Sequence, residues 1–284
     1  MINISNLSFG YKKGNLLYKD LSLSLIEGNI YGLLGKNGAG KSTLLKNIAG
    51  SLFPIGGCVS VDGMIPQKRL PSFLRAVYYI PEECFVPAIT VKQYTALFGI
   101  FYPDFNADQL FVYLKELEVV VPGKLSALSF GQQKKFIIAF ALACNTKVIL
   151  MDEPTNGLDI PSKTQFRKLI ASVMNDKRII FISTHQTRDL ENLIDQVVII
   201  DSGNLLLSAS IDEITSKLHF ETVSELPAEI KVIYAEEHLK GTSIVRENTT
   251  GEDSRLNLEH LFNGTTQNPQ LLKQIFTAKN NNHE

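Results

Sequence analysis

A glycine-rich run near the start of the chain has the residue types needed to bind phosphate. It reads G-K-N-G-A-G-K-S-T over residues 35–43 and fits the spacing G-x-x-x-x-G-K-S/T. Glycines let backbone N–H groups approach phosphate oxygens, while Lys41 can reach the β- and γ-phosphates and Ser42 can ligate Mg²⁺. The pattern therefore predicts a nucleotide site that holds Mg²⁺. Its predicted nucleotide-binding residues are Gly35, Asn37, Gly38, Ala39, Gly40, Lys41, Ser42 and Thr43.

Two carboxylates, Asp152 and Glu153, directly follow the apolar run at residues 148–151. Asp152 is predicted to hold Mg²⁺, and Glu153 is placed to polarise an attacking water, a general-base role typically worth about 10²–10⁴-fold in rate. An Asp-Glu pair at the end of a strand is commonplace, and alone it has a structural explanation as often as a functional one. Together with the phosphate motif, the pair indicates the second half of a hydrolytic nucleotide site.

The elements that must position these residues are short apolar runs, rich in Ile and Val, at residues 30–34, 148–151 and 179–182. Runs of this length without polar alternation are typical of parallel strands that are buried on both faces. Helical stretches separate them, so we predict an α/β domain. Ligands bind beyond the carboxyl ends of such strands, where the phosphate motif, the acidic pair and His185 all fall. We therefore interpret His185 as a ligand-contacting residue rather than a core histidine.

Other segments predict two smaller units beside this sheet. Alternating Leu and Ser over residues 21–25 indicate a half-buried strand, and together with residues 2–7 and 59–61 they predict a small antiparallel sheet. Residues 90–118 have helical periodicity, with leucines on one face.

Beyond about residue 215 the chain carries no catalytic motif. Strands are predicted near residues 231–235 and 242–246, and short helices near 256–262 and 269–276. We interpret this region as a packing or dimer-support appendage, and a regulatory ligand site is the alternative.

The amino-acid composition argues against several classes of protein. Lys+Arg 28 against Asp+Glu 29 leave a formal net charge of -1, which argues against a generally basic nucleic-acid-binding surface. The three cysteines form no CxxC pair, as expected in a reducing compartment. The opening residues lack the apolar core of a signal peptide, and no run approaches the length of a membrane span. We therefore expect a cytoplasmic, globular chain.

Residues 128–132 read L-S-F-G-Q and resemble the LSGGQ signature of the ATP-binding-cassette (ABC) ATPases. The phosphate motif, this signature, the Asp-Glu pair, the segment 155–159 and His185 follow one another in that family's order. The resemblance covers roughly residues 1–210. It implies an α/β P-loop NTPase fold of the ABC type, with a mainly parallel sheet core, an N-terminal antiparallel β subdomain and a helical subdomain.

The domain organisation predicted on this basis has two parts. A nucleotide-binding domain spans residues 1–214, with its helical subdomain at about 88–140. The small α+β C-terminal appendage, over residues 215–284, is the accessory region.

The resemblance also implies how ATP is bound and hydrolysed. In this family two cassettes face each other head to tail with two ATP molecules between them, and the signature of one contacts the γ-phosphate held by the other. His185 would contact the γ-phosphate from the same chain as the phosphate motif, and Asp159 would help join the two halves. The catalytic residues thus implied are Lys41, Glu153 and His185. The further nucleotide-contacting residues are Tyr11, which would stack on adenine, and Ser129, Gly131, Gln132 and Asp159.

Two positions depart from the family pattern. Phe130 replaces the first glycine of the signature, and we expect little loss because Gly131 keeps the close approach. Glu82 follows Pro81 where the family usually has glutamine. We predict that Glu82 joins Ser42 and Asp152 as a metal ligand, and a solvated loop carboxylate is the alternative. The Pro-Glu-Glu run resembles the ATP-binding subunits of bacterial exporters.

The function that the resemblance implies is the ATP-hydrolysing subunit of an ABC transporter, an exporter by this comparison. A homodimer or heterodimer of cassettes would work with separate transmembrane permease subunits at the inner face of the membrane, and no nucleic-acid partner is expected. The alternative is a soluble ABC ATPase of a non-transport assembly, repair or translation machine. The sequence lacks the second cassette, long heptad insertion and zinc cysteines of such machines. A nucleotide-binding module without hydrolysis is disfavoured because Glu153 and His185 are both present.

Overall fold

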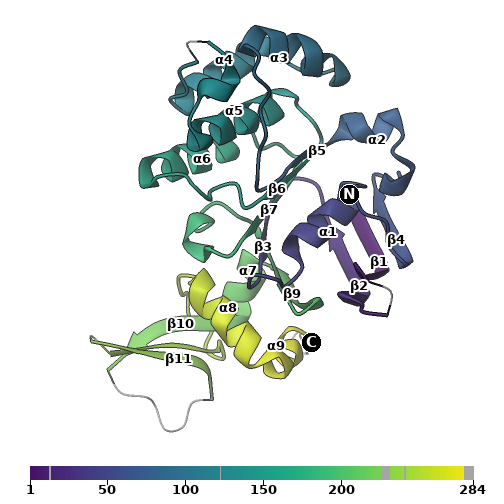
Figure 1. The fold of residues 1–284 in the computed structure, drawn as a ribbon. Helices are drawn as coiled ribbons and strands as arrows, with labels where there is room; N and C mark the ends of the chain where they lie inside the picture. Colours follow the sequence, from purple (N-terminus) through teal and green to yellow (C-terminus); the bar gives the residue numbers. More distant parts are fainter. Residues whose placement is uncertain (13, 122, 225–230, 240, 278–284) are drawn as a thin grey trace.

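A six-stranded sheet with the order β5-β6-β7-β3-β8-β9 forms the centre of the molecule (Figure 1). The structure, a computed structural model, describes residues 1–12, 14–121, 123–224, 231–239 and 241–277. The first five strands run parallel and β9 returns antiparallel. The strands are β3 (Asn29–Leu34), β5 (Val77–Ile80), β6 (Val148–Asp152), β7 (Ile179–Thr184), β8 (Gln196–Asp201) and β9 (Asn204–Ser210).

The central strands are buried on both faces, as their unbroken apolar runs predict. Every residue of β6 and β7 is buried, and in β3 only the first residue is partly exposed. Because parallel strands share one carboxyl edge, the chain segments that follow β3, β6 and β7 meet there. These segments begin with Gly35, Glu153 and His185.

The predicted N-terminal antiparallel sheet is confirmed, with the strand order β2-β1-β4. Helix α1 (Lys41–Ile48) packs between this sheet and one face of the central sheet, since its apolar residues share a core cluster with both. The strands are β1 (Ile2–Phe9), β2 (Tyr18–Leu25) and β4 (Gly56–Val61).

Helices cover the opposite face of the central sheet and extend into a helical subdomain. The predicted helical stretch at residues 90–118 is two helices rather than one. A 3₁₀ turn and a loop containing Pro103 separate them, because proline cannot continue a helix. The helical elements before and on this face are η1 (Pro66–Lys68), α2 (Pro71–Ala76), α3 (Val91–Phe98), η2 (Gly99–Phe101), α4 (Ala107–Glu116), η3 (Leu125–Ala127), α5 (Phe130–Ala143) and α6 (Ile160–Ser172).

The C-terminal region packs against the end of the central sheet through a continuous core. Phe220 and Leu261 belong to the same apolar cluster as Leu207 of β9. The strands and helices predicted near residues 231–276 are present, and α7 and β10 are additional. The elements are η4 (Thr187–Asp189), α7 (Ile211–Lys217), β10 (Leu218–Val223), β11 (Val232–His238), β12 (Gly241–Glu247), α8 (Leu258–Gln267) and α9 (Pro269–Thr277).

The predicted domain boundary after residue 214 falls inside helix α7, so the helix carries the chain across it. Residues 225–230, 240 and 278–284 of the predicted accessory region lie outside the described residues. Among the helices that the structure describes, none combines the length and the apolar character needed to span a bilayer.

Candidate functional site

The phosphate motif forms the floor of a cleft of about 850 Å³ at the carboxyl edge of the sheet. Residues 36–38 and 40–43 line this cleft, together with Glu153 and His185. The other two residues of the motif that are predicted to bind the nucleotide, Gly35 and Ala39, are turned toward the protein interior. Gly35 approaches Ile200, whose carbonyl oxygen would lie 2.7 Å from an added Cβ, and Ala39 is buried.

At Gly40 the backbone of the phosphate motif requires glycine, because no side chain fits there. Gly40 has φ 111°, and an added Cβ there would collide with the hydroxyl of Tyr18. That hydroxyl donates a hydrogen bond to the carbonyl oxygen of Gly40. The fully buried Tyr18 side chain from β2 therefore holds the loop at the residue that caps helix α1.

Asp152, at the end of β6, accepts hydrogen bonds from three hydroxyl groups. The hydroxyls of Ser42 and Ser183 donate to its Oδ1 at 2.9 and 2.7 Å, and that of Tyr79 donates to its Oδ2 at 3.3 Å. Burial raises the pKa of Tyr79, which keeps its hydroxyl protonated as a donor. Mg²⁺ prefers hard oxygen ligands and keeps several waters, so Ser42 and Asp152 side by side fit this ion.

Glu153, which directly follows β6, contacts both Lys41 of the phosphate motif and His185. Its Oε1 lies 3.4 Å from the Lys41 amine and 2.9 Å from Nδ1 of His185. Its backbone has φ 46°, a left-handed conformation that is costly for a residue with a side chain. The surrounding contacts hold the carboxylate at the cleft wall with 4% of the residue exposed.

Lys134, from helix α5, holds the backbone behind Glu153. Its amine donates to the carbonyl oxygens of Glu153 at 2.8 Å and of Asn156 at 3.1 Å. Burial lowers the pKa of Lys134, although the nearby acidic groups oppose this shift. The next lysine, Lys135, donates instead to the carbonyl oxygen of Leu117, just past α4, at 2.9 Å.

Tyr11 and Glu82 lie at the rim of the cleft. Tyr11 is 65% exposed, and its hydroxyl shares a hydrogen bond of 2.9 Å with the Thr43 hydroxyl. Its ring meets the Phe9 ring edge to face, with centroids 5.0 Å apart, and the stacking of Tyr11 on adenine stays a prediction. Glu82 accepts a hydrogen bond from the Asn156 amide at 2.9 Å. Its predicted role as a metal ligand stays a prediction.

The signature residues lie outside the cleft of their own chain. Exposed Ser129 caps α5, because its hydroxyl accepts the N–H of Gln132 and the Gln132 side chain accepts the N–H of Ser129. The Phe130 ring packs on Gly157, where an added Cβ would lie 3.1 Å from it. Gly131 approaches the carbonyl oxygen of Gly157. The signature is thereby linked to the segment 155–159.

Asp159 ends that segment and caps helix α6. Its carboxylate accepts the N–H of Ser162 at 2.9 Å, and hydrogen bonds from Ser162 hold the pKa of Asp159 below its usual range. Both Asp159 and Ser129 are solvent-exposed, so neither completes the site within this chain.

Three residues that hold the site were missed by sequence reasoning. Ser183 lies at the end of β7, two residues before His185, and this position could have suggested it. Tyr79 and Lys134 belong to segments far from the acidic pair in sequence, and no local pattern pointed to them.

Comparison with known proteins identifies the family. The profile described as ABC transporter matches residues 18–156. The chain is 31% identical to the uncharacterised ABC transporter ATP-binding protein YdbJ of Bacillus subtilis, over 72% of this chain and 69% of that protein. It is 30% identical to the energy-coupling factor transporter ATP-binding protein EcfA2 of Staphylococcus aureus, over 75% and 81%. It is 26% identical to the linearmycin resistance ATP-binding protein LnrL of Bacillus subtilis, over 80% and 74%.

Solved structures agree on the fold. An ATP-binding subunit of an ABC transporter matches with a TM-score of 0.68 at 24% identity, over 75% of this chain and 91% of that one. CbiO1 from Clostridium perfringens, part of the ABC transporter complex cbiONQ, matches with a TM-score of 0.63 at 25% identity, over 75% and 89%. The predicted fold class and ATPase activity are thus confirmed. The chain belongs to the ABC transporter family, as one of its ATP-hydrolysing, ATP-binding subunits.

Proposed function

We propose that this chain is the ATPase subunit of an exporter, held at the inner face of the membrane by separate transmembrane subunits. The observation that carries the proposal is the division of the site into two parts. Lys41, Glu153 and His185 line one cleft, and Asp152 accepts a hydrogen bond from Ser42, which also lines it. The signature lies on an exposed surface outside this cleft. A second cassette is needed to bring a signature to each cleft.

Within one chain, the contacts define the steps that its own residues perform. Lys41 binds the β- and γ-phosphates, which draws its amine away from Glu153. Ser42 and Asp152, which lie side by side, would hold Mg²⁺, and the ion would supply charge neutralisation at the phosphates. Glu153 then orients and polarises the attacking water, and His185, whose Nδ1 lies beside the same carboxylate, contacts the γ-phosphate. These residues supply positioning and charge stabilisation, as phosphoryl transfer requires.

Closure of two cassettes is the step that couples ATP to motion. The N–H groups at the start of α5 would receive the γ-phosphate held by the opposite chain, because a helix N-terminus favours anions. Asp159, on the same exposed side, would join the halves. Binding of ATP therefore favours the dimer and hydrolysis releases it.

An apolar groove offers the surface for a membrane partner. It has a volume of about 490 Å³ and lies between the central sheet and the helical subdomain. Phe101 in its lining is 59% exposed, and Phe98 and Leu74 are also exposed. Exposed aromatic groups that line a concave surface favour binding of an apolar helix. We infer that a helix of the transmembrane subunit docks here.

Export as the direction of transport has two supports. The Pro-Glu-Glu run at residues 81–83 resembles exporter subunits. The name of LnrL refers to resistance to linearmycin, which suits removal of a toxic compound. EcfA2 carries the name of an energy-coupling factor transporter, so the direction needs a direct test.

The test of the partner uses Glu153→Gln, which should trap the ATP-bound dimer. Tagged protein is captured from detergent-solubilised cells with ATP and Mg²⁺, and co-purifying proteins are identified. We expect a stoichiometric polytopic membrane protein, lost with Phe101→Glu and retained with Phe111→Glu. Phe111 is the matched control because it is 61% exposed on α4 but does not line the groove. Capture of soluble assembly factors or ribosomes would refute the transporter assignment.

The test of direction uses the captured pair in inside-out membrane vesicles. ATP should drive accumulation of an exported compound inside these vesicles, and Glu153→Gln should abolish it. ATP-driven release of a preloaded compound, with no accumulation, would instead indicate import.

A further inference from the structure

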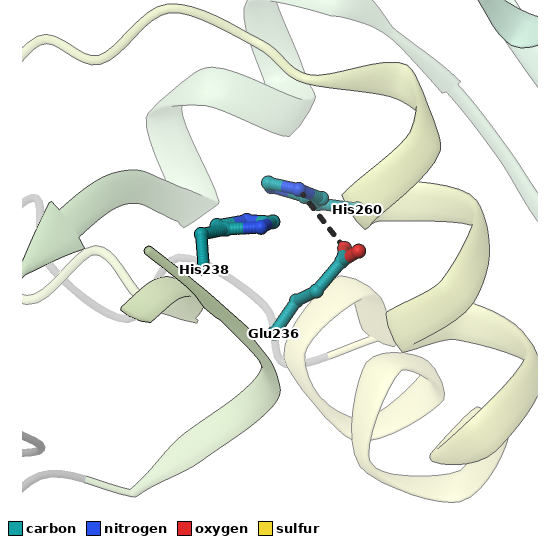
Figure 2. A group of neighbouring side chains, drawn as sticks. All are labelled: Glu236, His238 and His260. Carbon is teal, nitrogen blue, oxygen red and sulfur yellow. Dashed lines mark ion pairs between the residues drawn. The ribbon is translucent and has the colours of Figure 1, made fainter. Parts of the chain in front are cut away.

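A cluster of two histidines and one glutamate lies in the C-terminal region, and none of the three residues lines the ATP cleft. Glu236 and His238 come from β11, and His260 comes from the first turn of α8 (Figure 2). One potential ligand atom from each side chain lies within 4.8 Å of the other two. Neither the ATPase activity nor the transport function assigns a role to these three residues.

We propose that Glu236, His238 and His260 form a binding site for a divalent transition-metal ion such as Zn²⁺. Imidazole nitrogens and a carboxylate oxygen are a donor set that Zn²⁺ uses, with water in the fourth position. Imidazole donors also separate this site from the hard oxygen ligands that Mg²⁺ prefers.

The spacing of the donors fits this ion. Two ligands that are each about 2.0–2.1 Å from a tetrahedral ion stand about 3.4 Å apart. Glu236 Oε2 and His260 Nε2 are separated by 3.4 Å. The His238 ring stacks on that of His260, with centroids 6.5 Å apart and an interplanar angle of 23°. Because His238 is exposed, a side-chain rotation can bring its nitrogen to the ion.

The backbone holds two of the ligands on one side of the sheet. Glu236 and His238 are two residues apart on β11, so their side chains project from the same face. β11 is an edge strand of the three-stranded sheet, and α8 packs against it. An ion bound here would therefore link the edge strand to the helix.

Neighbouring polar groups fix the glutamate. The Tyr234 hydroxyl donates to Glu236 Oε2 at 3.1 Å, and the Asn263 amide donates to that hydroxyl at 3.1 Å. Groups of this kind orient metal ligands in known sites.

The surroundings also suit a cation. A pocket of about 330 Å³ adjoins the cluster, and Glu191 and Glu259 line it beside His238 and His260. Arg188 of η4 is directed to Glu259, with which it forms an ion pair of 3.3 Å. The lining of this pocket thus has the carboxylates of Glu191, Glu236 and Glu259 against the single guanidinium of Arg188.

The experiment measures Zn²⁺ binding to the full chain, purified without a histidine tag. Isothermal titration calorimetry gives the affinity and stoichiometry, and Co²⁺ substitution gives a visible spectrum that reports the ligand geometry. We expect one strongly bound Zn²⁺ per chain, tetrahedral Co²⁺ bands, and a higher melting temperature with Zn²⁺. His238→Gln, His260→Gln and Glu236→Gln should each weaken binding by more than about tenfold.

His219→Gln is the matched control, because His219 lies 4.0 Å from Glu221 in the same sheet but outside the cluster. It should bind Zn²⁺ as the unmodified chain does. His238→Gln keeps the test valid if a buried variant fails to fold, since this exposed side chain supports little packing. Equal Zn²⁺ affinity in His238→Gln and the unmodified chain overturns the proposal, as does absence of Zn²⁺ binding to the unmodified chain. Neither result depends on transport.

Discussion

The buried amine of Lys134 connects helix α5, which follows Ser129 of the signature, to the backbone of Glu153, the predicted general base. Lys134 is fully buried, and its two hydrogen bonds end on the carbonyl oxygens of Glu153 and Asn156. Lys134→Met keeps a flexible apolar stem of similar length but removes both donors. The Asn156 carbonyl oxygen then loses the amine, and the Glu153 carbonyl oxygen keeps only the N–H of Asn156, at 3.2 Å. The strained turn at Glu153 therefore loses a support.

The magnitude follows from those two contacts. A hydrogen bond to a charged group contributes about 1.5–3 kcal/mol, and part of this is offset because a buried ammonium no longer has to be desolvated. We expect the free energy of unfolding to fall by about 2–4 kcal/mol, which is roughly 5–10 °C in melting temperature. A shift of about 1 Å in the Glu153 carboxylate would lower kcat about 100-fold.

The assay is steady-state ATP turnover, with nucleotide affinity and thermal unfolding measured on the same samples. Lys134 does not line the cleft, so Lys134→Met should lower kcat and leave nucleotide affinity nearly unchanged. Lys135→Met is the matched control, since Lys135 is the adjacent buried lysine and donates to Leu117 instead. It should lower stability and leave kcat unchanged. Equal kcat for the two folded variants would refute the argument that Lys134 positions Glu153.

Three other substitutions test separate parts of the site. Gly40→Ala should weaken binding of a fluorescent ATP analogue and lower the free energy of unfolding by about 1–3 kcal/mol, because Tyr18 occupies the place of the new Cβ. Unchanged affinity for the analogue would contradict this. Glu153→Gln should reduce ATP turnover by about 10²–10⁴-fold while retaining ATP binding, and near-normal turnover would remove Glu153 as the base. Ser129→Arg should keep the ATP affinity of the single chain but prevent the ATP-dependent dimer in light scattering. A normal dimer would show that the signature is not at the interface.

The parts of the site that the sequence predicts are contiguous motifs. The phosphate loop at residues 35–43 is recognisable because binding phosphate calls for neighbouring backbone N–H groups and two side chains within one short segment. The strands before Gly35, Asp152 and His185 are recognisable because burial on both faces demands unbroken apolar runs. The shared carboxyl edge of parallel strands then places these three segments together before any coordinates are known.

The remaining contacts join segments that are far apart in the chain, and only packing decides them. Lys134 could have projected to solvent, but the docking of α5 on the sheet directs its amine to Glu153. His260 meets Glu236 and His238 because α8 packs against β11. No local preference encodes such meetings, since each depends on how helices and strands fill the core together. The sequence by itself thus determined the phosphate motif, the acidic pair and the buried parallel strands that precede them, whereas the order of those strands in the sheet came from the tertiary structure. The tertiary structure alone decided which side chains hold the segment that carries the predicted catalytic carboxylate, and which donors gather in the C-terminal region.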